Sequence, residues 1–203
     1  MIGELIRTLE KITVDRTSIG IEGVPFSGKT FYIHKNYNCN KFYNLSEHML
    51  FQNTVPSFVT SPWPSYPDAM IFRQAYFLNL EQERWNFAKN ISQIKIFDRT
   101  VLSIIGYLYA RTLLLSSSKE VWLSVLGILA EAIKQKKIKI PAQIIWLDTD
   151  YSLILKRAKD NERGCEDFLL KKSTYDILRE FYRETLSLLH DNKLISLKII
   201  KSE

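Results

Sequence analysis

Short runs of apolar and β-branched residues alternate along the chain with longer segments in which apolar positions recur every three or four residues. The short runs are residues 18–22, 41–45, 94–97, 143–147 and 197–200, and the longer segments are residues 68–90, 99–115, 119–137, 150–160 and 166–190. A short apolar run bounded by turn residues is typical of a buried strand, and the longer spacing is typical of an amphipathic helix. The alternation predicts an α/β fold whose parallel sheet is covered on both faces.

Two stretches depart from this alternation. Residues 1–14 have the pattern of a short amphipathic helix, which we place in an N-terminal helical extension over residues 1–16. Residues 53–67 carry four of the six prolines, and a stretch of this kind predicts a loop of the length that often forms a lid or a binding segment. Pro141 predicts the break between a long helix and the fourth strand.

Size and composition indicate one globular domain over residues 1–203. The chain has 203 residues, of which 46% are hydrophobic and 25% charged, which is ordinary for a packed domain. No apolar run reaches the roughly 18 residues that a membrane span needs, so no membrane partner is expected. Cys39 and Cys165 have no metal-like spacing and form no disulfide framework, which predicts a cytoplasmic protein with reduced thiols.

The chain has a net charge of +6, and its basic residues are concentrated at one place, a lysine cluster at residues 134–139. A basic run at the end of a predicted helix is usually a solvated face that also favours the negative end of the helix dipole. No recognisable nucleic-acid module surrounds it, so no nucleic-acid polymer is expected as a partner.

Residues 23–30 (GVPFSGKT) match the phosphate-binding pattern G-x-x-x-x-G-K-[ST] between a predicted strand and a predicted helix. The glycines let the backbone curl so that successive N–H groups point at a phosphate chain, and the helix adds its positive end. The predicted nucleotide-binding residues are Gly23, Pro25, Phe26, Ser27, Gly28, Lys29 and Thr30. Lys29 is expected to reach the outer phosphates and Thr30 to bind Mg²⁺. The alternative is a glycine-rich turn with an exposed lysine.

Asp98 and Arg99 follow the third predicted strand. Ligands of parallel sheets bind at the carboxyl ends of the strands, so both side chains are expected to face the same crevice as Lys29. There Asp98 can hold Mg²⁺ through water or accept a proton, and Arg99 can bind a phosphoryl group in transfer. The alternative is a helix start, with Asp98 as a cap and Arg99 in solvent.

Arg157 and Arg163 flank a short polar segment within residues 156–166. Two arginines arranged in this way can form a lid that closes over phosphates and excludes water. A charged helix end with intrahelical ion pairs has the same pattern, and both interpretations stay open.

Together these stretches resemble the thymidylate kinases. The resemblance rests on Ile21-Glu22-Gly23 with Gly28-Lys29-Thr30, on the D-R-x-x-S-x-x-x-Y-like segment from Asp98 to Tyr107, and on Leu147-Asp148 with the lid arginines. It runs from about residue 18 to residue 184, and the related deoxynucleoside kinases share this architecture. Residues 74–76 (QAY) are similar to the region of the deoxynucleoside kinases whose glutamine reads the base.

The resemblance implies a three-layer P-loop NTPase fold with a five-stranded parallel sheet, and transfer of the γ-phosphoryl group of ATP to a nucleotide or nucleoside with Mg²⁺. Lys29 and Thr30 would bind donor phosphates and metal, with Asp98 also at the metal, and Arg99 would contact the phosphoryl group. Arg157 and Arg163 would close the lid. The expected partners are therefore ATP and a small phosphoryl acceptor.

The acceptor side departs from the thymidylate kinases. Residues 44–48 (NLSEH) stand where that family carries Arg-Glu-Pro-Gly-Gly, Tyr76 stands where it has an arginine, and Ile105 stands where it has a glutamine. Arg73 is the nearest replacement for the arginine. Glu47 is the candidate catalytic base by analogy with deoxynucleoside kinases, or else a glutamate at a helix start after Ser46.

The remaining predictions concern the acceptor and the assembly. The candidate acceptor-binding residues are Phe72, Arg73, Gln74 and Tyr107. The losses on the acceptor side leave two alternatives open, a kinase of a non-nucleoside compound and a nucleotide-binding regulatory protein without kinase activity. Residues 101–115 and 121–133 can either pair two copies into a homodimer or form buried core.

Overall fold

The computed structural model describes residues 1–47, 66–114, 119–160 and 167–202. Along the chain these residues form α1 (Ile2–Leu9), β1 (Thr13–Glu22), α2 (Lys29–Asn36), β2 (Phe42–Leu45), α4 (Pro67–Ala88), β3 (Ile94–Asp98), α5 (Val101–Leu114), α6 (Lys119–Lys134), β4 (Lys139–Thr149), α7 (Tyr151–Lys159), α8 (Asp167–Leu170), α9 (Lys172–Asp191) and β5 (Ser196–Ser202). All five predicted strands are present, and each lies at its predicted place in the chain.

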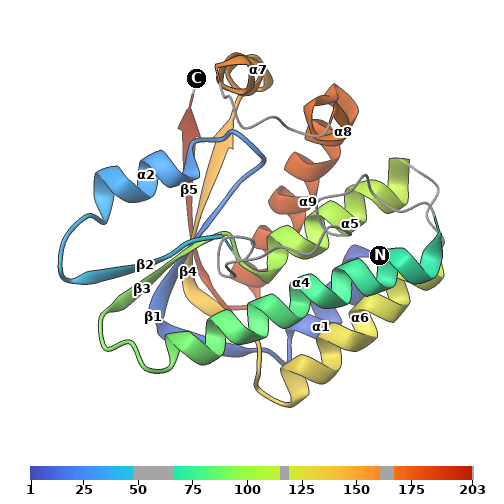
Figure 1. Ribbon diagram of the computed structural model, residues 1–203, viewed down its shortest axis with the longest axis horizontal. Coiled ribbons are helices and arrows are strands. Elements are labelled where there is room, and N and C mark those ends of the chain that lie inside the picture. The colour runs from blue at the N-terminus through green and yellow to red at the C-terminus, as the bar shows by residue number, and fades with distance from the viewer. Residues whose placement is uncertain (48–65, 115–118, 161–166, 203) are drawn as a thin grey trace.

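The five strands form one parallel sheet in the order β2-β3-β1-β4-β5. Parallel neighbours need crossover connections, and helices supply them here. Figure 1 shows α2 on one face of the sheet and α1, α4, α5, α6 and α9 on the other. The predicted three-layer α/β fold is therefore confirmed, with β1 at the centre of the sheet.

Among the described residues, two apolar clusters hold the layers together. The larger cluster lies between the sheet and the five-helix layer and includes Phe97, Trp122, Leu126 and Phe181, all nearly inaccessible to solvent. The smaller one is formed by isoleucines and a leucine of the central strands together with Ile33 of α2. Burial on both faces explains why the central strands are continuous apolar runs in the sequence.

The N-terminal extension is shorter than predicted. Helix α1 ends at Leu9, and β1 begins at Thr13. Strand β4 begins at Lys139 and contains Pro141, so this proline does not mark the start of the strand. The pairing of β1 with β4 is irregular between Asp15 and Ile19, directly beside Pro141, and such a bulge accommodates a residue that has no N–H to donate.

The ends of two predicted helices also differ. Helix α6 stops at Lys134, three residues before the predicted end, and the last predicted helix is divided into α8 and α9 at residue 171. Of the predicted loop at residues 53–67, all but the last two residues lie outside the described part of the chain. Among the described helices, none combines the length and the apolar character that a membrane crossing requires.

The apolar segments that were candidates for pairing two copies supply much of the core. Val101, Leu102 and Leu108 of α5 are fully buried, as are Trp122 and Leu129 of α6. The core interpretation therefore accounts for most of their apolar positions, and a homodimer stays a prediction.

Candidate active site

The loop between β1 and α2 has the backbone conformation that the phosphate-binding pattern requires. Gly23 (φ 150°) and Gly28 (φ 92°) both have positive φ. A Cβ on Gly23 would lie only 2.7 Å from Ser27 Oγ and 2.8 Å from the carbonyl oxygen of Leu147. Phe26 also has a positive φ of 60°. The sequence pattern thus reflects a loop geometry in which only glycine fits at position 23.

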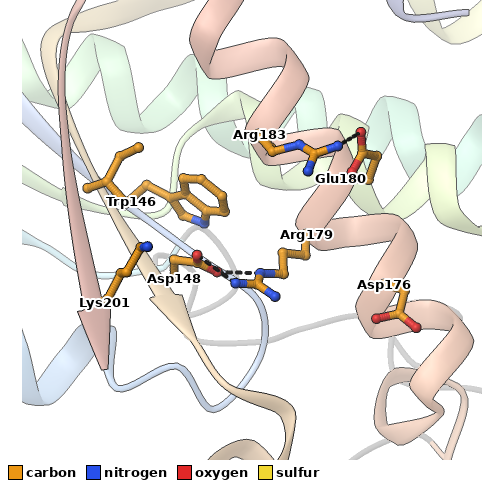
Figure 2. A pocket seen from close by; sticks show the side chains of 8 residues that line it. Trp146, Asp148, Asp176, Arg179, Glu180, Arg183 and Lys201 are labelled. Atoms are coloured by element: carbon orange, nitrogen blue, oxygen red, sulfur yellow. Dashed lines mark hydrogen bonds and ion pairs between the residues drawn. The ribbon is translucent and has the colours of Figure 1, made fainter. Parts of the chain in front are cut away.

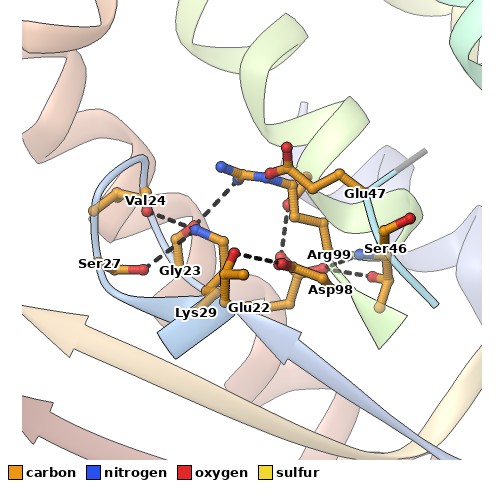
Figure 3. A network of polar contacts seen from close by, with 12 residues as sticks. Glu22, Gly23, Val24, Ser27, Lys29, Ser46, Glu47, Asp98 and Arg99 are labelled. Carbon is orange, nitrogen blue, oxygen red and sulfur yellow. Dashed lines mark hydrogen bonds and ion pairs between the residues drawn. The ribbon is translucent and has the colours of Figure 1, made fainter. Parts of the chain in front are cut away.

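Lys29 is the first residue of α2, and its side chain turns back into this loop. Its Nζ donates to the carbonyl oxygens of Gly23 at 3.0 Å and Val24 at 2.9 Å, and to Ser27 Oγ at 3.3 Å, as Figure 3 shows. Lys29 is only 5% exposed. This burial contradicts the alternative of a glycine-rich turn with an exposed lysine.

Burial also changes the protonation of Lys29. Desolvation, followed by repulsion from the Arg99 guanidinium, lowers the pKa of Lys29 to about 7, against a smaller opposite effect of Asp98. A phosphate bound at this helix N-terminus would place negative charge beside the Lys29 amine. It would therefore raise the pKa of Lys29 and favour the charged form.

Thr30 and Asp98 form the oxygen pair predicted at the metal. Thr30 Oγ1 donates to Asp98 Oδ2 at 2.8 Å, across 68 residues of sequence. Asp98 is buried, and its other oxygen, Oδ1, has no hydrogen-bond partner among the described residues. A buried carboxylate oxygen without a donor suits a cation, and a hydroxyl with one carboxylate is the kind of protein ligand set that Mg²⁺ shares with substrate phosphates.

Arg99 and Glu47 meet across the ends of β3 and β2. Arg99 Nε donates to Glu47 Oε1 in a close ion pair, and Nη1 lies 3.4 Å from the carbonyl oxygen of Gly23 (Figure 3). Its guanidinium also lies over the ring of Tyr107, 5.5 Å from the ring centroid. The side chain of Arg99 is 11% exposed and that of Glu47 is 31% exposed. Arg99 is therefore not a solvated residue at a helix start.

Arg157 lies against the same loop from the side of α7. Its Nη1 donates to the carbonyl oxygen of Ser27 at 2.9 Å and lies 3.4 Å from that of Phe26. This end of the predicted lid thus contacts the phosphate-binding loop. Arg163, with residues 161–166 of the predicted lid, lies outside the described residues, and its role stays a prediction.

The acceptor candidates on α4 are divided by burial. Phe72 is 63% exposed, whereas Arg73 and Gln74 are buried at 6% and 1%. The amide oxygen of Gln74 has no hydrogen-bond partner among the described residues. Their role in binding an acceptor stays a prediction.

Glu22 is a site residue that the sequence reasoning singled out only as part of a motif. It is fully buried and accepts hydrogen bonds from the Thr100 backbone N–H at 2.7 Å, from Thr100 Oγ1 at 2.6 Å and from Ser103 Oγ at 2.6 Å. Burial raises the pKa of Glu22, against the effect of these donors and of Arg99. The acidic residue thus connects the end of β1 to the start of α5.

Arg84 of α4 was missed by the sequence reasoning. It is fully buried and donates to the backbone carbonyl oxygens of Ser46 at 2.9 Å, Asp98 at 3.2 Å and Arg99 at 2.7 Å. In the sequence, Glu81 and Arg84 have the spacing of an ordinary surface ion pair on a helix. Helical spacing alone therefore gave no signal that this pair lies in the core.

A charged groove lies between α9 and the edge of the sheet (Figure 2). It has a volume of about 450 Å³ and is lined by Trp146, Asp148, Asp176, Arg179, Glu180, Arg183, Ile199 and Lys201. Arg179 makes a bidentate contact with Asp148 at 2.6 and 2.8 Å, and Arg183 pairs with Glu180. None of the predicted site residues within the described part of the chain lines this groove.

Solved kinase structures share the fold. A deoxyadenosine kinase from M. mycoides with bound dATP superposes with a TM-score of 0.68, at 20% identity over 91% of this chain and 90% of that one. A structure of deoxyadenosine kinase from M. mycoides with bound dCTP gives 0.65 at 16% identity, over 91% and 89% of the two chains. The structure with the products dCMP and a flexible dCDP gives 0.64 at 17% identity, over 92% and 90%.

No protein-family model and no curated protein matches the sequence. At such low identity the structural likeness establishes the fold. It confirms the expected P-loop kinase architecture, which the deoxyadenosine kinase structures share.

Proposed function

We propose that the protein is an ATP-dependent kinase that transfers the γ-phosphoryl group to a hydroxyl of a nucleoside. The observation that carries this proposal is the Glu47–Arg99 ion pair, whose arginine also lies 3.4 Å from the Gly23 carbonyl oxygen of the phosphate-binding loop. A carboxylate, a phosphoryl-binding cation and the donor loop thus meet at one edge of the sheet. The shared fold supports the proposal, because the neighbouring structures are those of deoxyadenosine kinases.

The carboxylate favours a hydroxyl acceptor over a phosphate acceptor. A hydroxyl keeps its proton at neutral pH and needs a base within hydrogen-bond reach during transfer. A phosphate monoester, whose second pKa is about 6, is already ionised, so it needs no base and would be repelled by Glu47. A nucleoside therefore fits this arrangement better than a nucleotide.

The reaction assigns one task to each side chain. Glu47 accepts the proton of the acceptor hydroxyl as its oxygen forms a bond to the γ-phosphorus, and the bond from that phosphorus to the β,γ-bridging oxygen breaks to release ADP. Arg99, Lys29 and Arg157 offset the negative charge on the phosphoryl oxygens and hold the groups in line. Positioning and positive charge are most of what phosphoryl transfer requires of a protein.

Thr30 and Asp98 are the residues that would hold Mg²⁺ beside the donor phosphates. Their 2.8 Å hydrogen bond and the free Asp98 Oδ1 within the described site support this assignment. When bound, the ion neutralises phosphate charge as the donor bond breaks. Asp98 has the further task of fixing the Thr30 hydroxyl.

A transfer assay tests the proposal directly. The protein is incubated with γ-labelled ATP, Mg²⁺ and separate panels of deoxynucleosides, ribonucleosides, their monophosphates and non-nucleoside hydroxyl compounds. Label is expected in the products of one or more nucleosides and in none of the monophosphates. Transfer only to monophosphates or only to non-nucleoside compounds would overturn the nucleoside assignment, and ATP binding without any transfer would favour a regulatory role.

Glu47→Gln tests the base within the same assay. Loss of a general base lowers kcat by about 100- to 10,000-fold, and the affinity for ATP should change little because the carboxylate faces the acceptor. The matched control is Glu131→Gln, since Glu131 is an exposed glutamate of α6. Equal kcat values for the two variants would remove Glu47 from the mechanism.

A further inference from the structure

The turn after β3 has an unusual backbone. Arg99 has a φ of 66°, in the left-handed region that residues with a side chain rarely adopt. This conformation turns the chain between the end of β3 and the start of α5, where Arg99 reaches Glu47 and the Gly23 carbonyl oxygen. Such a conformation persists only where the surrounding structure fixes it from several sides.

Two sets of hydrogen bonds hold this turn. On the amide side, the N–H of Arg99 donates to the Ile21 carbonyl oxygen at 3.0 Å, and the N–H of Thr100 donates to Glu22. On the carbonyl side, the Arg84 guanidinium donates to two backbone carbonyl oxygens of the turn, that of Asp98 through Nη1 and that of Arg99 through Nη2. Arg84 thus supplies the donors that the carbonyl oxygens of the turn require.

The same guanidinium also reaches Ser46, the residue directly after β2. Nη1 of Arg84 donates to the carbonyl oxygen of Ser46 at 2.9 Å, one residue before Glu47. Figure 3 shows Ser46 beside the Asp98–Arg99 turn, with Glu47 extending toward the Arg99 side chain. One rigid group therefore links the strand end that carries Glu47 to the strand end that carries Arg99.

The surroundings of Arg84 are specific to a guanidinium. The group is fully buried, lies 2.7 Å from Glu81 Oε2 and stacks over the Phe97 ring at 4.9 Å from its centroid. A planar fork with several fixed donors can bind three carbonyl oxygens and a carboxylate at once, whereas the ammonium of lysine is a compact point charge on a flexible stem. Burying this charge without such partners would be strongly unfavourable.

We infer that Arg84 is a positioning residue that sets the placement of Glu47 against Arg99. The inference rests on the proposed function, since the two groups it aligns are the proposed base and the phosphoryl-binding arginine. Arg84 itself lies behind the strand ends and contacts their backbone, so its effect on the reaction passes through the other two residues.

Steady-state kinetics of Arg84→Lys test this role. Misplacement of a catalytic group by about 1 Å costs on the order of 100-fold in rate, so kcat is expected to fall about 100-fold while KM for the nucleoside stays within about threefold. The control is Arg179→Lys, another arginine with a bidentate contact, which lies in the groove of Figure 2. A kcat equal to that of the control overturns the inference.

A second measurement does not depend on kinase activity. Urea unfolding of Glu47→Gln, Arg99→Gln and the double variant gives the coupling between these residues, first with Arg84 and then with Arg84→Lys present. We expect the coupling to be lost in the Arg84→Lys background, and retained coupling overturns the inference. An inactive wild-type protein would refute the proposed function, and the coupling would still decide the role of Arg84.

Glu81→Gln provides a milder variant if Arg84→Lys does not fold. It keeps the guanidinium and removes the charge of its ion-pair partner. The expected result is a smaller fall in kcat, of about tenfold, together with a reduced coupling between Glu47 and Arg99. Unchanged values of both overturn the inference, because Arg84 would then act only on stability.

Discussion

At Lys29, the requirements of phosphate binding oppose the stability of the unliganded protein. The residue is 5% exposed, and its ammonium lies among two carbonyl oxygens and a hydroxyl of the loop that would hold a phosphate chain. The same burial lowers its pKa to about 7. A charged group held in this way is costly to the unliganded fold, which is a common feature of binding sites.

We predict that Lys29→Met raises the stability of the unliganded protein and abolishes phosphoryl transfer. The folded-state pKa of about 7 lies below the value near 10.4 of an unfolded chain, so the unfolded chain binds more protons between these two pH values. Wild-type stability therefore gains from this lysine as pH rises. The advantage of Lys29→Met should be largest at or below about pH 7 and should shrink toward about pH 10.

Thermal unfolding of both proteins at several pH values measures this gap. Each kcal/mol of added stability moves the Tm of a chain of this size by about 2–4 °C. Lys134→Met serves as control, because the Lys134 side chain is 80% exposed and its removal should leave no such dependence on pH. A difference in Tm between the two proteins that stays constant across the pH range would contradict the prediction that Lys29 is buried and partly neutral.

At the scale of secondary structure, Glu22 connects three elements at the core of the site. It ends β1, accepts hydrogen bonds from both donors of Thr100 ahead of α5, and binds Ser103 within α5. Ser103 Oγ in turn lies 2.9 Å from the hydroxyl of Tyr182 on α9. A buried carboxylate thus fixes the start of α5 and, directly before it, the turn that contains Arg99.

Glu22→Ala is expected to lower the free energy of unfolding by about 2–3 kcal/mol, because it leaves buried donors of Thr100 and Ser103 without an acceptor. Chemical denaturation with urea measures the change. Glu131→Ala, at an exposed position of α6, should stay within about 0.5 kcal/mol of wild type. A similarly small effect of Glu22→Ala would mean that these donors find other partners.

At the scale of the whole molecule, the candidate residues follow the carboxyl ends of β1, β2 and β3. Because the sheet is parallel, these ends all lie at the same side of the sheet. The order β2-β3-β1-β4-β5 puts β3 between β2 and β1, so Glu47, Arg99 and the phosphate-binding loop are brought together. This is the edge at which open α/β sheets bind their ligands. Arg157 reaches the loop from α7, directly after β4.

A nucleotide that binds this edge should stabilise the entire fold. Mg²⁺ and ATP at about 100 times the dissociation constant add about 2.7 kcal/mol, which corresponds to a rise in Tm of roughly 5–10 °C for a chain of this size. Lys29→Met should lose most of this shift, because the Lys29 side chain lies at the loop centre. An equal shift in both proteins would place the nucleotide elsewhere.

The local pattern of the chain was sufficient to predict the strands, most helices and the phosphate-binding loop. Apolar runs indicate buried strands because both faces of a parallel sheet are covered, and the glycine spacing indicates the loop because a Cβ at Gly23 would meet Ser27 and Leu147. The errors fall at element ends, such as the start of β4 around Pro141, where a bulge in the paired strand permits the proline.

The sequence by itself determined the class of fold and the residues that stand at the ends of β1 and β3. Only the tertiary structure decided that Glu47 lies against Arg99 and that Arg84 is buried beneath both. Strand order and helix packing arise from contacts between residues far apart in the chain. The periodicity of a helix or strand is local, so it does not predict these contacts. An acidic and a basic residue three positions apart on a helix have the same pattern whether water or a core surrounds them.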